Sequence, residues 1–149
     1  MENSKDAFMK EFPVEKNSTR LESHRIQTEL DIVRARQLIR HLSKEAGIGI
    51  VDQTRLTTAV SELFRNMYHF AGGGEVFIDK GEHQGREALI ITCVDQGPGI
   101  ANIEEAMSDG FTSSNGMGLG LPGARRLVDA FYIESKVNEG TMVRVVKWI

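Results

Sequence analysis

Two stretches of the chain carry apolar residues at the three- and four-residue spacing of an amphipathic helix. The first follows Asp31, which can cap a helix, and ends at Gly47, a residue suited to a helix C-terminus. The second follows Asp52 and stops at residues 72–74, which are all glycine. The apolar stripes are Ile32, Ala35, Ile39, Leu42 and Ala46 in the first stretch, and Leu56, Ala59, Val60, Leu63, Met67 and Phe70 in the second. The pattern predicts two helices that each bury one face.

Shorter apolar runs with the character of strands surround these helices. Residues 24–30 are expected to form a first strand, residues 75–79 and 87–94 a hairpin, and residues 132–137 and 141–148 a closing hairpin. Both hairpins are closed by short polar segments that contain glycine. The sequence therefore predicts five strands, four of them in hairpins.

The region between the hairpins completes the order of elements. Residues 102–107 fit one helical turn, and a third helix is expected to begin near Pro122, a residue common at the first helical position. Residues 108–115 are polar, and we expect them to form a lid. The order strand, two helices, hairpin, helix, hairpin predicts an α+β fold, a two-layer sandwich with helices on one face of a mixed β-sheet.

Length and composition narrow the classes of protein. A chain of 149 residues forms one domain by length alone, and we expect a polar, mobile tail at 1–20 before a single domain at 21–149. The net charge of −3 gives no reason to expect a nucleic-acid partner. No apolar stretch resembles a signal peptide or is long enough to span a membrane, so the expected location is the cytoplasm. The single cysteine, Cys93, excludes an internal disulfide bond and a cysteine metal cluster.

The segment 95–100, Asp-Gln-Gly-Pro-Gly-Ile, follows an apolar strand and is typical of a nucleotide-base pocket. A carboxylate at the end of such a strand must find a partner or stay hydrated, and the amino group of adenine would supply donors to Asp95. Gly97 and Gly99 would let the backbone approach a planar ring closely, with Ile100 packed on the ring. The alternative is a simple turn, which also suits a strand end.

The segment 116–123, Gly-Met-Gly-Leu-Gly-Leu-Pro-Gly, contains the pattern G-x-G-x-x-G of dinucleotide-binding folds. That fold needs a strand before the pattern and a βαβ unit after it, whereas here a polar loop precedes the glycines and only a tight hairpin follows. The segment also lacks the Gly-Lys-Ser/Thr ending of a Walker loop. A glycine loop at a helix N-terminus remains, able to bind phosphate through backbone N–H groups. The residues expected to contact the nucleotide here are Gly116, Gly118, Gly120 and Leu121.

Glu62 and Asn66 are four residues apart on the second helix and therefore share one face. Asn66 could supply an amide oxygen to Mg²⁺, and Glu62 could act as a general base on an attacking hydroxyl. The alternative is a solvated helix face with a local ion pair between Glu62 and Arg65. Taken alone the alternative is favoured, and the two glycine segments downstream reverse that choice. Thr141 could place its hydroxyl beside the base, although alone it is an ordinary strand threonine.

These segments resemble the ATP-binding fold shared by gyrase, Hsp90, histidine kinases and MutL, called the GHKL or Bergerat fold. Glu62 and Asn66 look like its N box, residues 95–99 like its first glycine box, and residues 116–120 like its second. Gly140-Thr141 looks like the last piece of the site, and the resemblance covers roughly residues 20–149.

One position departs from this family. Many members carry a histidine four residues after the metal-binding asparagine, where this chain has Phe70. His69 lies one place early, so we expect a partly exposed helix histidine without a catalytic role.

Within the fold, the chain is most similar to small bacterial serine kinases that act as anti-sigma or stressosome switch proteins, especially the T-type switch kinases. The segments that carry this likeness are 52–55, 61–63, 65–66, 71–74 and 118–123. The resemblance implies an ATP- and Mg²⁺-dependent protein serine/threonine kinase whose partner is a STAS-domain antagonist protein, and which also activates a PP2C-type phosphatase when released. An anti-sigma kinase that binds a sigma factor directly stays open. A non-catalytic ATP-gated binding module also stays open, although pure binding needs no base at Glu62.

Overall fold

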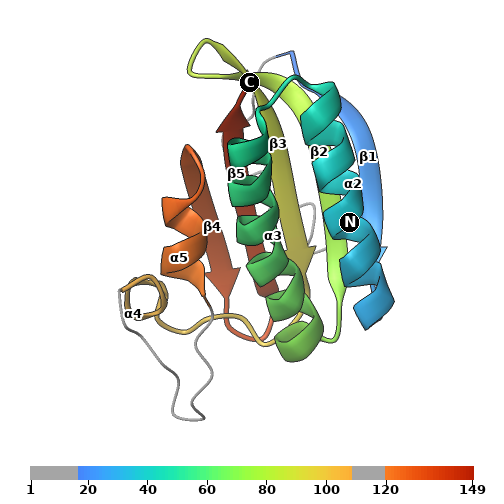
Figure 1. Cartoon of the computed structure of the whole chain (residues 1–149). Helices are drawn as coiled ribbons and strands as arrows, with labels where there is room; N and C mark the ends of the chain where they lie inside the picture. The colour runs from blue at the N-terminus through green and yellow to red at the C-terminus, as the bar shows by residue number, and fades with distance from the viewer. Residues whose placement is uncertain (1–16, 109–119) are drawn as a thin grey trace.

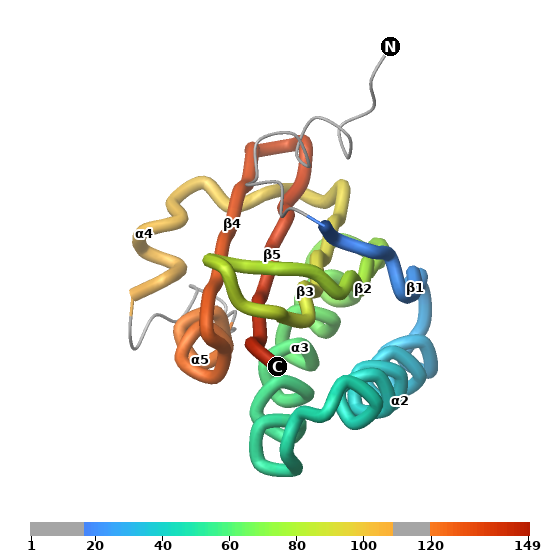
Figure 2. Tube along the Cα trace, turned by 90° about the horizontal axis from the view of Figure 1, so that it is seen from above, coloured from blue at the N-terminus to red at the C-terminus, as the bar shows by residue number. Residues whose placement is uncertain are grey.

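The computed structural model describes residues 17–108 and 120–149. Its elements are, in chain order, β1 (Thr19–Ile26), α2 (Glu29–Glu45), α3 (Ile50–Ala71), β2 (Gly74–His83), β3 (Arg86–Asp95), α4 (Ile103–Ala106), α5 (Leu121–Arg126), β4 (Ala130–Lys136) and β5 (Gly140–Trp148). The five strands form one sheet in the order β1-β2-β3-β5-β4. Figures 1 and 2 show α2, α3 and α5 on the same side of this sheet. The predicted α+β sandwich with helices on one face is confirmed.

The sheet differs from the prediction in one respect, because it is antiparallel and not mixed. All four neighbouring strand pairs run antiparallel. The chain leaves β3 and reaches β4 through α4 and α5, and such a crossover favours a parallel neighbour. The hairpin β4–β5 places β5 between β3 and β4, so these two parallel strands never become neighbours.

The helix boundaries follow from local hydrogen bonds. Helix α2 begins at Glu29, earlier than predicted, because Thr28 and Asp31 form a capping box. The Thr28 hydroxyl accepts from the Asp31 N–H at 3.1 Å, and the Asp31 carboxylate accepts from the Thr28 N–H at 3.0 Å. This cap ends β1 at Ile26, so the first strand lies earlier than the predicted 24–30. Helix α3 begins at Ile50, just before the predicted Asp52, and ends as expected at a left-handed glycine, Gly72.

The main core lies between the helices and the sheet. Its largest fully buried members include Ile39 on α2, Phe64 on α3 and Ile91 on β3. This packing fixes α3 across the middle of the sheet (Figure 1), with its C-terminal end near the end of β3. The positions predicted for the apolar stripes of both helices are buried or half-buried.

Two predicted segments fall mainly on residues that the structure does not describe. The tail at 1–20 lies outside the described residues up to residue 16, and β1 begins at Thr19. The lid at 108–115 lies outside them except for Ser108. None of the helices in the described ranges is both long and apolar enough to cross a membrane.

Candidate functional site

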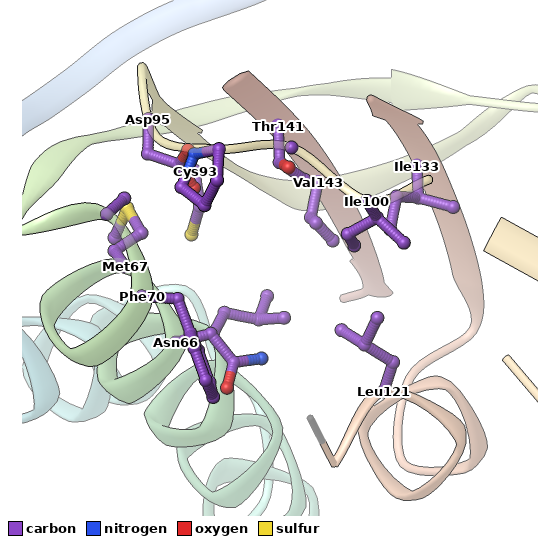
Figure 3. A pocket seen from close by; sticks show the side chains of 14 residues that line it. Asn66, Met67, Phe70, Cys93, Asp95, Ile100, Leu121, Ile133, Thr141 and Val143 are labelled. Atoms are coloured by element: carbon purple, nitrogen blue, oxygen red, sulfur yellow. The ribbon is translucent and has the colours of Figure 1, made fainter. Parts of the chain in front are cut away.

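A pocket of about 140 Å³ lies between the C-terminal half of α3 and the adjoining strand ends. Its lining is Leu63, Asn66, Met67, Phe70 and Ala71 from α3, Cys93 and Asp95 from β3, Pro98, Gly99 and Ile100 from the following loop, Leu121 from α5, and Ile133, Thr141 and Val143 from β4 and β5. Figure 3 shows Asn66 and Phe70 on one side of this space and Asp95, Thr141 and Ile100 on the other. The walls are mostly apolar, with a few polar groups from different elements, as in binding pockets for planar ligands.

Asp95 is the carboxylate of this pocket among the described residues that line it. It ends β3 and lies directly opposite Thr141 on β5. Burial raises the pKa of Asp95 above its ordinary value, while hydrogen bonds from the backbone N–H groups of Gly97 and Thr141 act in the opposite direction. The Gly97 N–H donates to Asp95 Oδ1 at 3.0 Å. A strong acceptor in an apolar pocket suits a ligand that brings N–H donors, as the amino group of adenine does.

The glycines of this turn bring protein backbone close to protein backbone. A Cβ at Gly97 would overlap Ala71 at the end of α3, and a Cβ at Gly99 would overlap the carbonyl oxygen of Lys136. Gly99 also has a left-handed φ of 76°. We expected these glycines to serve the approach to a ligand, and that role stays a prediction. The contacts show that they let the loop pack closely between α3 and the β4–β5 hairpin.

Gly99→Ala is expected to destabilise the protein by about 2–5 kcal/mol, because left-handed strain adds to a backbone overlap that side-chain motion cannot relieve. Gly85→Ala is the matched control: Gly85 has a similar φ of 78° but has open space where its Cβ would lie. That variant should lose only about 1–2 kcal/mol. Urea unfolding of both variants measures the difference. Equal losses would mean that the loop moves freely away from Lys136.

The start of α5 meets the face of α3 that carries Glu62. Gly120, with φ of 68°, precedes Leu121, which lines the pocket. A Cβ at Gly120 would overlap the carboxylate of Glu62. Gly120, the last glycine of the predicted phosphate loop before α5, therefore lies against Glu62, the predicted general base. Gly116 and Gly118 lie outside the described residues.

Glu62 does not line the pocket, whereas Asn66 does. The Glu62 carboxylate forms an ion pair with the Arg65 guanidinium, and both side chains are partly exposed. The local pair considered as an alternative is therefore present. Exposed pairs of this kind contribute little to stability, so this one does not prevent Glu62 from meeting another group.

No group of three or more His, Cys, Asp and Glu side chains in the described ranges is arranged to hold a metal ion. Magnesium seldom needs such a cage, because it is usually bound by one or two protein oxygens together with phosphates and water. Asn66 is suited to this kind of site. His69 is exposed, as expected, and packs edge-on against Tyr68, while Phe70 lines the pocket in the position where many GHKL proteins carry histidine.

Ser135 was missed by the sequence analysis. It lies on β4 directly opposite Thr141, and its hydroxyl contacts Ile100, Gly140 and Thr141. The residue has no motif of its own. Its alternation with Ile133, which lines the pocket, was the available signal that it faces the same side of the sheet.

The predicted residues are therefore placed as follows. Those that line the pocket are Asn66, Asp95, Gly99, Ile100, Leu121 and Thr141. Gly97, Gly120 and Glu62 adjoin it through the contacts described above. Their roles in binding and catalysis stay predictions.

Comparison with known proteins identifies the family of the chain. The family described as histidine kinase-, DNA gyrase B- and HSP90-like ATPase matches residues 51–148. The serine/threonine-protein kinase RsbT of Bacillus subtilis (strain 168) is 51% identical over 125 residues, which cover 84% of this chain and 94% of RsbT. The anti-sigma F factor of Geobacillus thermodenitrificans (strain NG80-2) is 35% identical over 107 residues, covering 67% of this chain and 72% of that protein.

A solved structure has the same fold at low sequence identity. The catalytic domain of the histidine kinase ThkA superposes with a TM-score of 0.52 and 16% identity, covering 86% of this chain and 96% of that domain. The chain belongs to the histidine kinase-, DNA gyrase B- and HSP90-like ATPase family, in its branch of serine/threonine-protein kinases.

Proposed function

We propose that this kinase uses Mg·ATP to phosphorylate a serine or threonine of a STAS-domain partner protein in a bacterial partner-switching pathway of the stressosome type. The observation that carries the proposal is the half-buried acceptor Asp95 in an apolar pocket, with Asn66 on the opposite wall. The likeness to RsbT supports the choice of a serine or threonine acceptor.

Each residue has a distinct role in this proposal. Asp95 accepts a hydrogen bond from the amino group of the base, Thr141 adds its hydroxyl beside it, and Ile100 packs on the ring. Gly97 and Gly99 shape the turn, and Gly116, Gly118, Gly120 and Leu121 contact the nucleotide. Asn66 supplies one oxygen to Mg²⁺, which when bound would neutralise phosphate charge. Glu62 takes the proton from the acceptor hydroxyl.

The partner class follows from the family resemblance. A STAS-domain antagonist is the class that the family resemblance implies, and activation of a PP2C-type phosphatase after release would be a second role in the same cytoplasmic pathway. The likeness to anti-sigma F factors supports an alternative, in which the chain binds a sigma factor directly.

A transfer assay with γ-labelled ATP tests the function. The purified chain is incubated with the labelled ATP and a STAS-domain protein, and in a second reaction with the labelled ATP and a sigma factor from the same cell. The modified residues are then mapped. Label on a serine or threonine of the STAS-domain protein is the expected result. ATP-dependent binding without transfer would support the binding module instead, and capture of the sigma factor alone would support the anti-sigma alternative.

Asn66→Ala is expected to weaken ATP binding about tenfold in Mg²⁺ and much less in excess EDTA, because the variant loses a metal ligand. Calorimetric titration under both conditions measures this. Asn102→Ala is the matched control, since the Asn102 side chain caps α4 outside the pocket, accepting from the Glu105 N–H at 2.9 Å. An equal loss with and without Mg²⁺ at Asn66 would indicate a packing role.

A further inference from the structure

The hydroxyl of Ser135 joins three parts of the pocket wall. It accepts from the backbone N–H of Ile100 at 2.7 Å and donates to the carbonyl of Gly140 at 3.0 Å. It also lies 2.8 Å from the hydroxyl oxygen of Thr141. The loop after β3 and the strands β4 and β5 therefore meet at this one side chain.

The single proton of Ser135 fixes the direction of this network. A hydroxyl offers one donor and two acceptor sites. When Ser135 donates to the Gly140 carbonyl, both of its acceptor sites are filled by the Ile100 N–H and the Thr141 O–H. Every group is then satisfied. In the opposite arrangement Ser135 would donate to Thr141, and the Gly140 carbonyl would lose this donor.

The favoured arrangement determines what Thr141 offers to a ligand. Because its proton points to Ser135, the Thr141 oxygen keeps only acceptor sites for the pocket that it lines. Asp95 lies opposite Thr141 across β3 and β5 and is also an acceptor. The two side chains together suit a ligand edge that carries an amino group, with its two N–H donors, and oppose one that carries a carbonyl oxygen.

We infer that Ser135 is a positioning residue that orients the Thr141 hydroxyl as an acceptor and so favours 6-amino over 6-oxo purine nucleotides. The inference rests on the proposed nucleotide site. Without Ser135, Thr141 can rotate its proton toward the pocket and donate to a carbonyl oxygen. The loss of Ser135 therefore lowers the ratio of the affinities for 6-amino and 6-oxo purine nucleotides. A residue with only a structural role would lower stability without changing this ratio.

The test compares ATP with inosine triphosphate, which carries an oxygen where ATP carries the amino group. Affinities of both are measured by calorimetry on the full chain. Ser135→Ala should narrow the preference for ATP on the order of 5- to 10-fold, the range of one or two hydrogen bonds. Ser135→Thr keeps the hydroxyl and should restore most of the preference. Thr141→Val removes the oriented group and should narrow the preference about as much as Ser135→Ala, with little further loss in the double variant.

Thr92→Val is the structural control. The Thr92 hydroxyl accepts from Arg144 Nε at 2.9 Å on the face of the sheet away from the helices, so this variant should lower the melting temperature with the wild-type preference retained. Wild-type preference in Ser135→Ala would overturn the inference. If that variant does not fold, unchanged preference in Thr141→Val overturns it. Equal wild-type binding of both nucleotides refutes the inference and the amino-group role of Asp95, while kinase activity stands. No binding of either nucleotide refutes the proposed function as well.

Discussion

Asp95→Asn is expected to lower the affinity for ATP about 100-fold or more, while the stability of the fold is kept or increased. The amide offers N–H donors where the amino group of the base needs an acceptor, and a mismatch between buried polar groups is expensive. The fold itself loses little, because the Asn carbonyl oxygen can still accept from the Gly97 N–H that now reaches Asp95 Oδ1 at 3.0 Å.

The expected gain in stability follows from the raised pKa of Asp95. The folded state holds this proton more tightly than the unfolded chain, whose carboxyl titrates near 3.8. As pH rises from 3.8 through the raised pKa, the unfolded chain ionises first, so the wild-type free energy of unfolding falls relative to the variant. The melting temperature of Asp95→Asn should therefore match that of wild type in acid and exceed it at neutral pH.

Asp31→Asn is the control with the opposite sign. Hydrogen bonds from the Gln27 and Thr28 N–H groups and the Thr28 hydroxyl lower the pKa of Asp31. Its contribution is present above 3.8 and is lost as pH falls through the lowered value, so this variant should be less stable at neutral pH and approach wild type in acid. Its ATP affinity should stay unchanged. Nucleotide titrations and thermal melts across pH measure both variants, and wild-type affinity in Asp95→Asn would refute the adenine assignment.

The sequence predicted the parts of the fold that depend on local patterns. The stripes on α2 and α3 follow from residue spacing, and Gly72 marks a helix end wherever the helix lies. The start of α2 was placed late because Asp31 and Thr28 both resemble caps, and only their reciprocal hydrogen bonds distinguish N-cap from third residue. The antiparallel sheet depends on β5 lying between β3 and β4, a long-range pairing that no local pattern encodes.

The residues of the candidate site also divide into those that a local pattern predicts and those that depend on long-range pairing. Asp95 could be predicted because a carboxylate at the end of an apolar strand conflicts with its surroundings wherever it occurs. Ser135 could not, because its importance comes from the register that sets it opposite Thr141 and near Ile100. The contact between Gly120 and Glu62 likewise joins residues that are 58 positions apart in the chain.

Glu62→Ala is expected to lower phosphoryl transfer on the order of 100-fold or more while ATP affinity stays within about twofold of wild type. Glu62 lies one helical turn before Asn66, outside the pocket that holds the adenine ring in our proposal. The loss of its carboxylate should therefore slow the reaction and leave ATP binding in the ground state unchanged. Single-turnover transfer to a STAS-domain partner, run beside a nucleotide titration, separates the two quantities.

Two further variants distinguish a role of Glu62 as general base from a role in packing. Glu62→Gln keeps the shape that meets Gly120 and an oxygen for Arg65, but an amide cannot take the proton of the acceptor hydroxyl. It should therefore be nearly as slow as Glu62→Ala. Glu45→Ala removes another exposed helical carboxylate, paired with His41 at 3.1 Å, and should transfer at the wild-type rate. If Glu62→Gln transfers normally while Glu62→Ala loses ATP affinity, Glu62 serves to seat the start of α5, and the proton must leave the hydroxyl by another route.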